Sequence, residues 1–344
     1  MRPFITLIFA ALVALPAFGQ TELTLPFGDE PGKVAYLNYK NNPGAEEPHP
    51  WGPLSFRNAG SEFWVADTVA GRVYRVDAAG KVLATIVTRK TGKNAVLEDI
   101  ALVRDAAGTV SGVWVADGME QQVVLYGTDG TKRKTFGAPG NEPGTFAQIA
   151  RIEAGPSGRV YVSDKGRQRI IVFDPEGKVV RELPWQWSGL CLDKDENLYH
   201  LEWNDQEKRV HLIAETFDGK PLLNKVLDLP PHTNSELWFI TPAGEAIITY
   251  SPDNAPLQAL KMARCTLDGK LVAILDIKLP IVMNRYLEPL DAESVWLGQV
   301  DYEKAPEGAF RVIPSDTASS PRADRFQKTP GRLHPSLPRG FAFP

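Results

Sequence analysis

Short segments of alternating apolar and polar residues recur along the whole chain, and turns rich in Gly, Asp and Pro separate them. Segments of this length and period are typical of β-strands. One apolar strand motif returns at intervals of about 50 residues, which is the signature of a repeat architecture. Its close copies are residues 63–67, 113–117 and 160–164, and its looser copies are 197–201, 246–250 and 294–298.

A turn precedes each of the six copies. Gly and Asn tolerate the positive φ that a two-residue hairpin requires, so we interpret these positions as the turn between a first and a second strand. A second set of turns closes an outer hairpin, and only the sixth copy lacks it. The first set is Gly60, Gly112, Gly158, Asn197, Gly244 and 291–293; the second set is 77–80, 129–130, 175–177, 218–219 and 268–269.

The missing outer strand of the last unit has a candidate at the start of the chain. Residues 21–28 resemble the strand and connector that begin at Lys134. We predict that this segment pairs with residues 309–313 and closes a ring, because closure leaves fewer open strand edges. The predicted fold is therefore all-β: a six-bladed β-propeller with four-stranded blades, the ring closed by the N-terminal strand pairing with the last blade.

The chain resembles the NHL-repeat family of six-bladed β-propellers, of the secreted bacterial type. The resemblance is carried by the connector FG-x-x-G-x-x-PG-x-F at 136–146, the strand end Tyr-Val-x-Asp at 161–164, and Arg-Ile-x-Val-Phe-Asp at 169–174. The resemblance is best over residues 134–180, whereas residues 185–313 match only in the spacing of strands and turns. The Asn-His-Leu tripeptide of the family is replaced at 70–73, 120–123 and 167–170.

The two ends of the chain fall outside the repeat. Residues 1–19 combine Arg2, an apolar run and a small-residue end, which predicts a secretory signal peptide cleaved near Gly19. We therefore expect a periplasmic or secreted protein, without a membrane span because no other segment is apolar enough. Residues 20–313 form the predicted propeller. Residues 314–344 form a Pro/Arg-rich tail that we expect to be disordered or laid loosely over the propeller.

The net charge of the chain argues against a nucleic-acid partner. The formal net charge is −4, and cleavage of the signal removes one Arg and no acid. Phosphate binding requires an excess of positive charge, so we expect no nucleic-acid partner, although some NHL propellers bind RNA.

Cys191 and Cys265 fall in strands at different radii of neighbouring blades, which predicts two buried thiols rather than a disulfide. We expect a monomer.

Three carboxylates repeat with the blades. Asp67, Asp117 and Asp164 each end a second strand, where loops gather at one face of the ring. As a functional site they would be ligands at the mouth of the channel. As structural residues, each would accept backbone N–H bonds and hold the turn into the next strand. We favour the structural role, because a binding site rarely needs the same group in successive blades.

No pattern in the chain specifies a metal site or a catalytic residue. Residues 193–197 begin like a calcium loop, but Leu198 and Asn204 occupy the required Gly and Glu positions, which favours a hairpin turn. The histidines lack zinc-ligand spacing, although His200 and His211 could converge with a residue of another blade. Nucleophile motifs are absent. We therefore predict no cofactor, and a divalent ion such as Ca²⁺ stays the alternative.

Some aromatic residues do not recur from blade to blade. Functional residues usually lie at such positions, because the repeated residues already account for the fold. Trp64, Trp114 and Trp296 repeat with the blades and are interpreted as packing residues. The residues that do not repeat are Trp51, at the end of the insertion 41–51, and Trp185, Trp187, Glu202 and Trp203. We predict that these five border a ligand-binding surface; the alternative is that they plug the channel or cover its rim.

Two functions fit these observations. The first is a non-catalytic binding or scaffolding module for a protein, a glycan or a small ligand outside the cytoplasm. The second is an enzyme with a divalent metal in the central channel, as in lactonases and amidating lyases of similar six-bladed form. We favour the first. They differ in whether three or four Asp, Glu, Asn or His side chains converge on one point.

Overall fold

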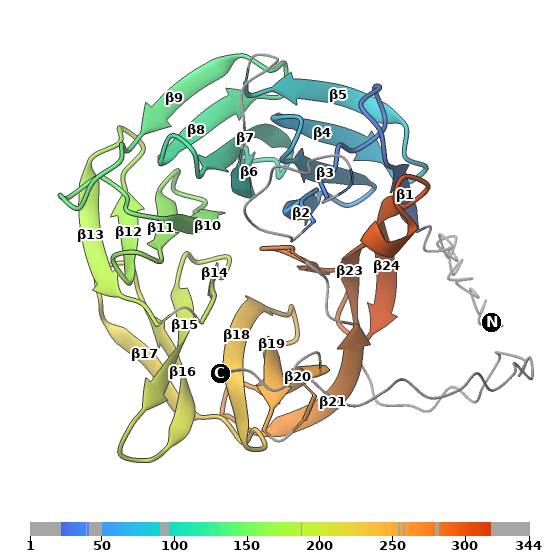
Figure 1. Ribbon diagram of the computed structural model, residues 1–344. Helices are drawn as coiled ribbons and strands as arrows, with labels where there is room; N and C mark the ends of the chain where they lie inside the picture. The colour runs from blue at the N-terminus through green and yellow to red at the C-terminus, as the bar shows by residue number, and fades with distance from the viewer. Residues whose placement is uncertain are drawn as a thin grey trace, which may run out of the picture.

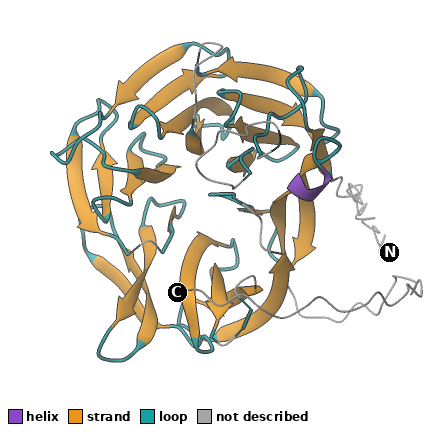
Figure 2. Ribbon diagram, viewed as in Figure 1, coloured by secondary structure: helices purple, strands orange, loops and turns teal. Residues whose placement is uncertain are grey.

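The computed structural model of the protein describes residues 22–38, 40, 50–89, 96–186, 188–253, 255–256, 259–278 and 282–317. Within these ranges the chain consists of strands and connecting loops, with one turn of 3₁₀-helix at Tyr302–Lys304 (Figure 2). None of the described segments forms an apolar helix of membrane-spanning length. The predicted signal peptide at 1–19 and residues 318–344 of the predicted tail lie outside the described residues.

Six antiparallel four-stranded sheets stand around a central axis and follow one another along the chain (Figure 1). In each of the first five sheets the first strand lies next to the axis and the fourth lies on the outside. Blade one contains β2 (Ser55–Asn58), β3 (Glu62–Asp67), β4 (Arg72–Asp77) and β5 (Val82–Val87). Blade two contains β6 (Leu97–Arg104), β7 (Val110–Asp117), β8 (Gln122–Gly127) and β9 (Lys132–Phe136). Blade three contains β10 (Ile149–Ala154), β11 (Val160–Asp164), β12 (Arg169–Phe173) and β13 (Val179–Pro184).

The remaining blades keep this arrangement. Blade four contains β14 (Leu190–Leu192), β15 (Leu198–Asn204), β16 (Arg209–Glu215) and β17 (Pro221–Val226). Blade five contains β18 (His232–Ile240), β19 (Glu245–Pro252), β20 (Ala259–Thr266) and β21 (Leu271–Lys278). Blade six contains, from the axis outwards, β22 (Leu287–Pro289), β23 (Ser294–Val300), β24 (Ala309–Asp316) and β1 (Leu23–Pro26). The predicted six-bladed fold is confirmed.

The N-terminal strand closes the ring as predicted. β1 runs antiparallel to β24, with Leu23 opposite Val312 and Pro26 opposite Ala309. It therefore supplies the outer strand that blade six does not receive from the C-terminal side. β24 continues to Asp316, past the predicted boundary at residue 313, because its last residues still pair with β23.

The turn of blade one is the predicted two-residue type, in which Ala59 N–H donates to the Glu62 carbonyl at 2.8 Å, whereas the turns of blades two to five are longer. In blade two, Asp105 N–H donates to the Thr109 carbonyl and Gly108 N–H donates to the Asp105 carbonyl, both at 2.9 Å. This is a three-residue turn whose last residue needs positive φ. Gly108 fills that place (φ +80°), so the assignment of the turn to Gly112, which lies inside β7, was wrong. In blade four Glu196 (φ +62°), not Asn197, adopts this conformation.

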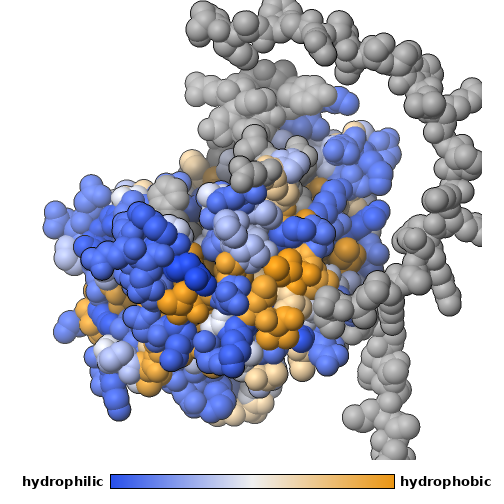
Figure 3. All heavy atoms as spheres, turned by 90° about the horizontal axis from the view of Figure 1, so that it is seen from below, coloured by the Kyte–Doolittle hydropathy of each residue, from blue (hydrophilic) through white to orange (hydrophobic). Residues whose placement is uncertain are grey.

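The core lies between the faces of neighbouring sheets. Trp64, Trp114 and Trp296 are buried there, which confirms their role in packing. Both cysteines are buried free thiols, as predicted. The side of the molecule seen in Figure 3 is largely hydrophilic, with smaller hydrophobic areas. The exposed large hydrophobic residues on the outer strands β17 and β21 are Leu222 and Val272.

Candidate functional site

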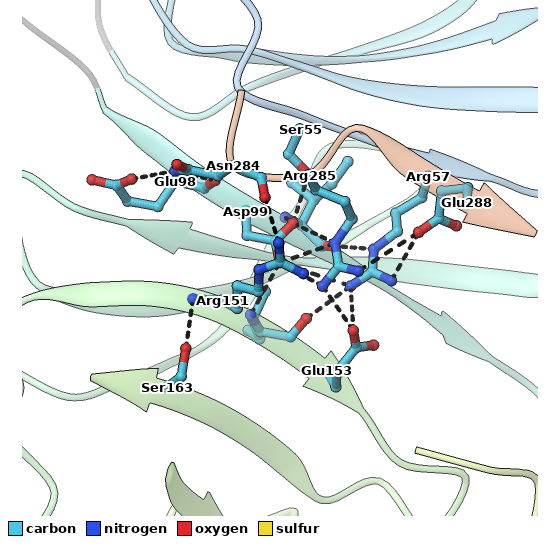
Figure 4. Close-up of polar contacts among 12 residues, drawn as sticks. Ser55, Arg57, Glu98, Asp99, Arg151, Glu153, Ser163, Asn284, Arg285 and Glu288 are labelled. Atoms are coloured by element: carbon cyan, nitrogen blue, oxygen red, sulfur yellow. Dashed lines mark hydrogen bonds and ion pairs between the residues drawn. The ribbon is translucent and has the colours of Figure 1, made fainter. Parts of the chain in front are cut away.

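A network of charged side chains from the innermost strands lines the central channel (Figure 4). Blade one contributes Arg57, blade two contributes Asp99, and blade three contributes Arg151 and Glu153. Arg285, just before β22, and Glu288 within it come from blade six. Adjacent residues of a strand face opposite ways, so a polar residue in an apolar inner strand can face the axis. Ring closure therefore brings these side chains together.

Asp99 lies at the centre of this network and is fully buried. It accepts hydrogen bonds from Ser55 Oγ (2.6 Å), from Ile152 N–H (3.1 Å) and from Arg285 Nε (3.0 Å) and Nη2 (2.9 Å). Burial by itself would raise the pKa of Asp99, but the guanidinium charges of Arg285 and Arg57 outweigh burial and hold that pKa well below its ordinary value. Asp99 is therefore an anchor that is ionised at neutral pH and joins four blades.

The other channel carboxylates are also paired with guanidinium groups. Glu153 lies 2.7 Å from Arg285 Nη2 and 3.1 Å from Arg57 Nη2. Glu288 lies 3.2 Å from Arg57 Nη1. Burial raises the pKa of Glu288, although Arg57 and Arg285 oppose this effect.

Arg151 connects the network to blade five. Its Nη2 donates to Glu236 Oε1 at 2.6 Å and to the Asn284 carbonyl at 2.8 Å, and its guanidinium stacks 4.2 Å from the Trp238 ring. Burial lowers the pKa of Arg151 below its ordinary value. Glu236 thus lies at the edge of the channel network and also lines the groove described below.

This donor set does not fit the divalent metal that the six-bladed enzymes suggested. Asp99, Glu153 and Glu288 already bind guanidinium groups, and a cation at the same oxygens would face their positive charge. Among the described residues, no group of three or more His, Cys, Asp or Glu side chains is placed to hold a metal ion. His211 instead contacts Asn224 and Glu207.

A groove of about 780 Å³ opens among blades three, four and five. Its lining comes from the ends of strands β15, β16 and β18, from the loop that joins β11 to β12, and from the connection between blades three and four. The lining residues are Lys165 and Gln168 after β11, Gln186 and Ser188 after β13, Leu201 and Trp203 of β15, Val210 of β16, and residues 232–236 of β18.

Backbone contacts between blades four and five hold the wall of the groove. Leu237 N–H donates to the Ser188 carbonyl at 2.8 Å, and Ser188 Oγ donates to the Leu201 carbonyl at 2.7 Å. Gly189 has a φ of +75° and lies against the Leu237 backbone, so a Cβ at this position would collide with it. The chain therefore needs Gly here for the two inner strands to approach.

Trp203 and His232 give the groove its chemical character. Trp203 is 40% exposed, and its indole N–H donates to Asp205 Oδ1 at 3.1 Å. His232 Nδ1 lies 2.6 Å from the Pro230 carbonyl, an acceptor, so Nδ1 carries the proton and Nε2 of the neutral ring is an acceptor. Nε2 is buried and has no hydrogen-bond partner in the described part of the chain.

The structure describes four of the five residues predicted to border a binding surface, and it separates them. Trp203 lines the groove. Trp185 is buried between blades three and four, where its indole N–H donates to the Gly189 carbonyl at 3.1 Å, so it packs the core rather than a surface. Glu202 is exposed beside Trp203 in β15 but does not line the groove, and Trp51 is half-buried and paired with Leu37. Trp187 lies outside the described residues.

The three repeated carboxylates sit in turns. Asp117 accepts the N–H groups of Met119 and Glu120, each at 3.0 Å, and Asp164 accepts those of the corresponding residues in blade three. Asp67 accepts the Ala35 N–H at 3.0 Å and pairs with Arg72 at 2.7 Å. Burial raises the pKa of Asp67 to about 6, against the opposing charge of Arg72. Each carboxylate thus already has partners within the protein.

Sequence reasoning missed the channel network. A signal was present, because Arg57, Asp99, Arg151 and Glu153 interrupt otherwise apolar segments just before a hairpin turn. Charged residues that face solvent interrupt apolar segments in the same way. Only the closed ring shows which charged side chains point to the axis and which point to solvent.

Comparison with known proteins leaves the function open. No family model and no curated protein matches this chain. A virginiamycin B lyase from Staphylococcus aureus is 15% identical, with a TM-score of 0.47, over 81% of this chain and 98% of the lyase. A streptogramin B lyase is 13% identical, with a TM-score of 0.45, over 79% and 96%. A chain of a nidogen/laminin complex is 16% identical, with a TM-score of 0.45, over 65% and 79%. Similarity this distant says nothing about activity, and the NHL assignment stays a prediction.

Proposed function

We propose that this chain is a non-catalytic binding propeller whose ligand occupies the groove among blades three, four and five. The observation that carries the proposal is Trp203, a large and well-exposed indole in a groove of about 780 Å³. Ligand sites typically have volumes of roughly 300–1,000 Å³ and combine apolar surface with a few polar groups. Leu201 and Val210 supply apolar surface beside the indole, and the strand-end residues of β18 supply polar groups.

The central channel is the less suitable site. Its carboxylates are committed to Arg57, Arg151 and Arg285, and each guanidinium bridges groups from other blades. A ligand that entered would have to break these buried ion pairs, which is costly. This is why we prefer a binding role in the groove to a metal-dependent enzyme in the channel. Metal analysis of the purified protein tests that preference, and one tightly bound metal ion per chain would reverse it.

We further propose that the protein acts outside the cytoplasm after cleavage near Gly19, as a monomer. The basis is the pattern of residues 1–19, which lie outside the described structure. N-terminal sequencing of the protein from its native host is expected to start near Gln20. A mature chain that begins at Met1 would refute export by this route, and size-exclusion chromatography with light scattering tests the monomer.

The groove is tested by following the Trp203 indole during a ligand screen. The mature protein, labelled with ¹⁵N, is mixed with oligosaccharides, short peptides and small aromatic compounds, and the indole N–H signals are recorded. The variant Trp203→Phe identifies the Trp203 signal by its loss. A ligand of the groove should shift this signal, and its affinity should fall in Trp203→Ala but not in Leu222→Ala, an exposed residue on the outer strand β17.

A ligand that binds wild type, Trp203→Ala and Leu222→Ala with equal affinity, and that does not shift the Trp203 indole signal, would show that the binding site lies elsewhere. The Leu222→Ala control separates a local effect from a general effect of removing exposed apolar surface.

A further inference from the structure

The groove presents a neutral polar surface. Its charged residues are one base, Lys165, and one acid, Glu236; Glu236 is paired with Arg151, and the charge of Lys165 acts on the carboxylate of Glu98. The other polar lining residues carry amide or hydroxyl groups, apart from the imidazole of His232. A charged ligand would meet no net opposite charge here, so charge complementarity favours an uncharged ligand.

The hydrogen-bonding groups of the groove suit a ligand that both donates and accepts. Amide side chains such as those of Gln168 and Asn234 offer donors and acceptors, and the hydroxyl of Thr233 does the same. The Nε2 of His232 has almost no accessible surface, so the donors and acceptors that a ligand can reach are those of the amide and hydroxyl side chains.

Trp203 adds a flat apolar surface to these groups. Its hydrogen bond to Asp205 limits rotation of the indole, and the apolar residues Leu201 and Val210 line the same groove. A sugar ring has matching chemistry: C–H groups cover its faces and hydroxyls surround its edge. Aromatic side chains with one apolar and one polar aspect favour ligands of this mixed character.

We propose that the groove binds an uncharged carbohydrate, with a sugar ring against Trp203 and with ring hydroxyls hydrogen-bonded to the amide and hydroxyl side chains of β18, such as Thr233 and Asn234. This inference rests on the proposed function, because it names the ligand class of the same groove.

The test uses the full mature protein and two sets of probes. The first set is an array of neutral oligosaccharides built from hexose, pentose and N-acetylhexosamine units, and the second is a set of uncharged peptides of similar length. Saccharides that bind are measured by calorimetry. Trp203→Ala is expected to weaken binding by at least about tenfold, as for an interface Trp of this kind. Trp203→Phe should retain part of the affinity.

Thr233→Val removes a hydroxyl at nearly constant volume and is expected to weaken saccharide binding several-fold. Leu222→Ala should leave it unchanged. If peptides shift the Trp203 signal and no saccharide does, the carbohydrate inference is overturned while the binding groove stands. If neither set shifts that signal, the carbohydrate inference and the proposed groove fail together. Saccharide binding that is equal in wild type, Trp203→Ala and Thr233→Val also overturns the inference.

Discussion

Leu25→Ala is expected to weaken the closure of the ring. Leu23 and Leu25 of β1 are fully buried, whereas Thr24 and Pro26 on the other face are exposed. Both leucines approach Gly80 in the outer turn of blade one, because a Cβ added to Gly80 would lie 3.8 Å from each. They therefore pack at the seam between the last blade and the first, where the ring closes.

The magnitude follows from the loss of buried methyl groups and from the cavity left behind. A buried Leu→Ala substitution costs about 2–5 kcal/mol. For a domain of this size, 1 kcal/mol corresponds to roughly 2 °C in Tm, so Leu25→Ala should lower Tm by about 4–10 °C. The double substitution of Leu23 and Leu25 should cost less than twice as much. The reason is that one substitution can already detach β1 from β24, and after that the second substitution removes contacts that no longer form.

Equilibrium unfolding in urea, followed by circular dichroism, measures this loss. Thr24→Ala is the matched control, because it lies on the same strand with its side chain exposed, and it should change stability by less than about 0.5 kcal/mol. Hydrogen exchange adds a local reading: the amides of β24 that pair with β1 should exchange faster in Leu25→Ala. If Leu25→Ala behaves like Thr24→Ala in both measurements, the leucine contacts do not hold the seam.

Three further predictions concern the buried polar groups. Arg285→Met leaves Asp99 without its main partner and should cost about 3–5 kcal/mol in unfolding free energy; a loss below 1 kcal/mol would show that the channel network does not stabilise the ring. Because the pKa of Asp99 is lowered in the folded state, its contribution to stability is fully present above its ordinary pKa of about 4 and is progressively lost as the pH falls below that value toward the lowered pKa of the folded state. Melting curves from pH 7 to 3 should therefore fall less steeply for Arg285→Met than for wild type, and parallel curves would contradict this. Glu196→Ala removes the acceptor of the Ser157 N–H and the Tyr161 hydroxyl and should cost about 1–3 kcal/mol, whereas Lys194→Ala on the same exposed turn should be neutral in urea unfolding.

The sequence by itself determined the number of blades and the closure of the ring. These properties depend on patterns within about 50 residues, namely strand alternation, turn residues and their return at a fixed interval. The similarity between residues 21–28 and an outer strand can likewise be recognised from the sequence alone. The turn positions were less accurate. Gly112 was misassigned because a Gly in a β-rich segment can occupy either a turn or a strand, as it does in β7.

Only the tertiary structure decided where the chemistry lies. Trp185 and Trp203 both depart from the repeat, yet Trp185 is buried and Trp203 lines the groove, since their exposure depends on how blades three, four and five meet. Arg285 and Asp99 are 186 residues apart in the chain and pair only because the closed ring returns blade six to blade two. Local pattern specifies strands, but the burial and partners of a polar side chain depend on residues distant in sequence.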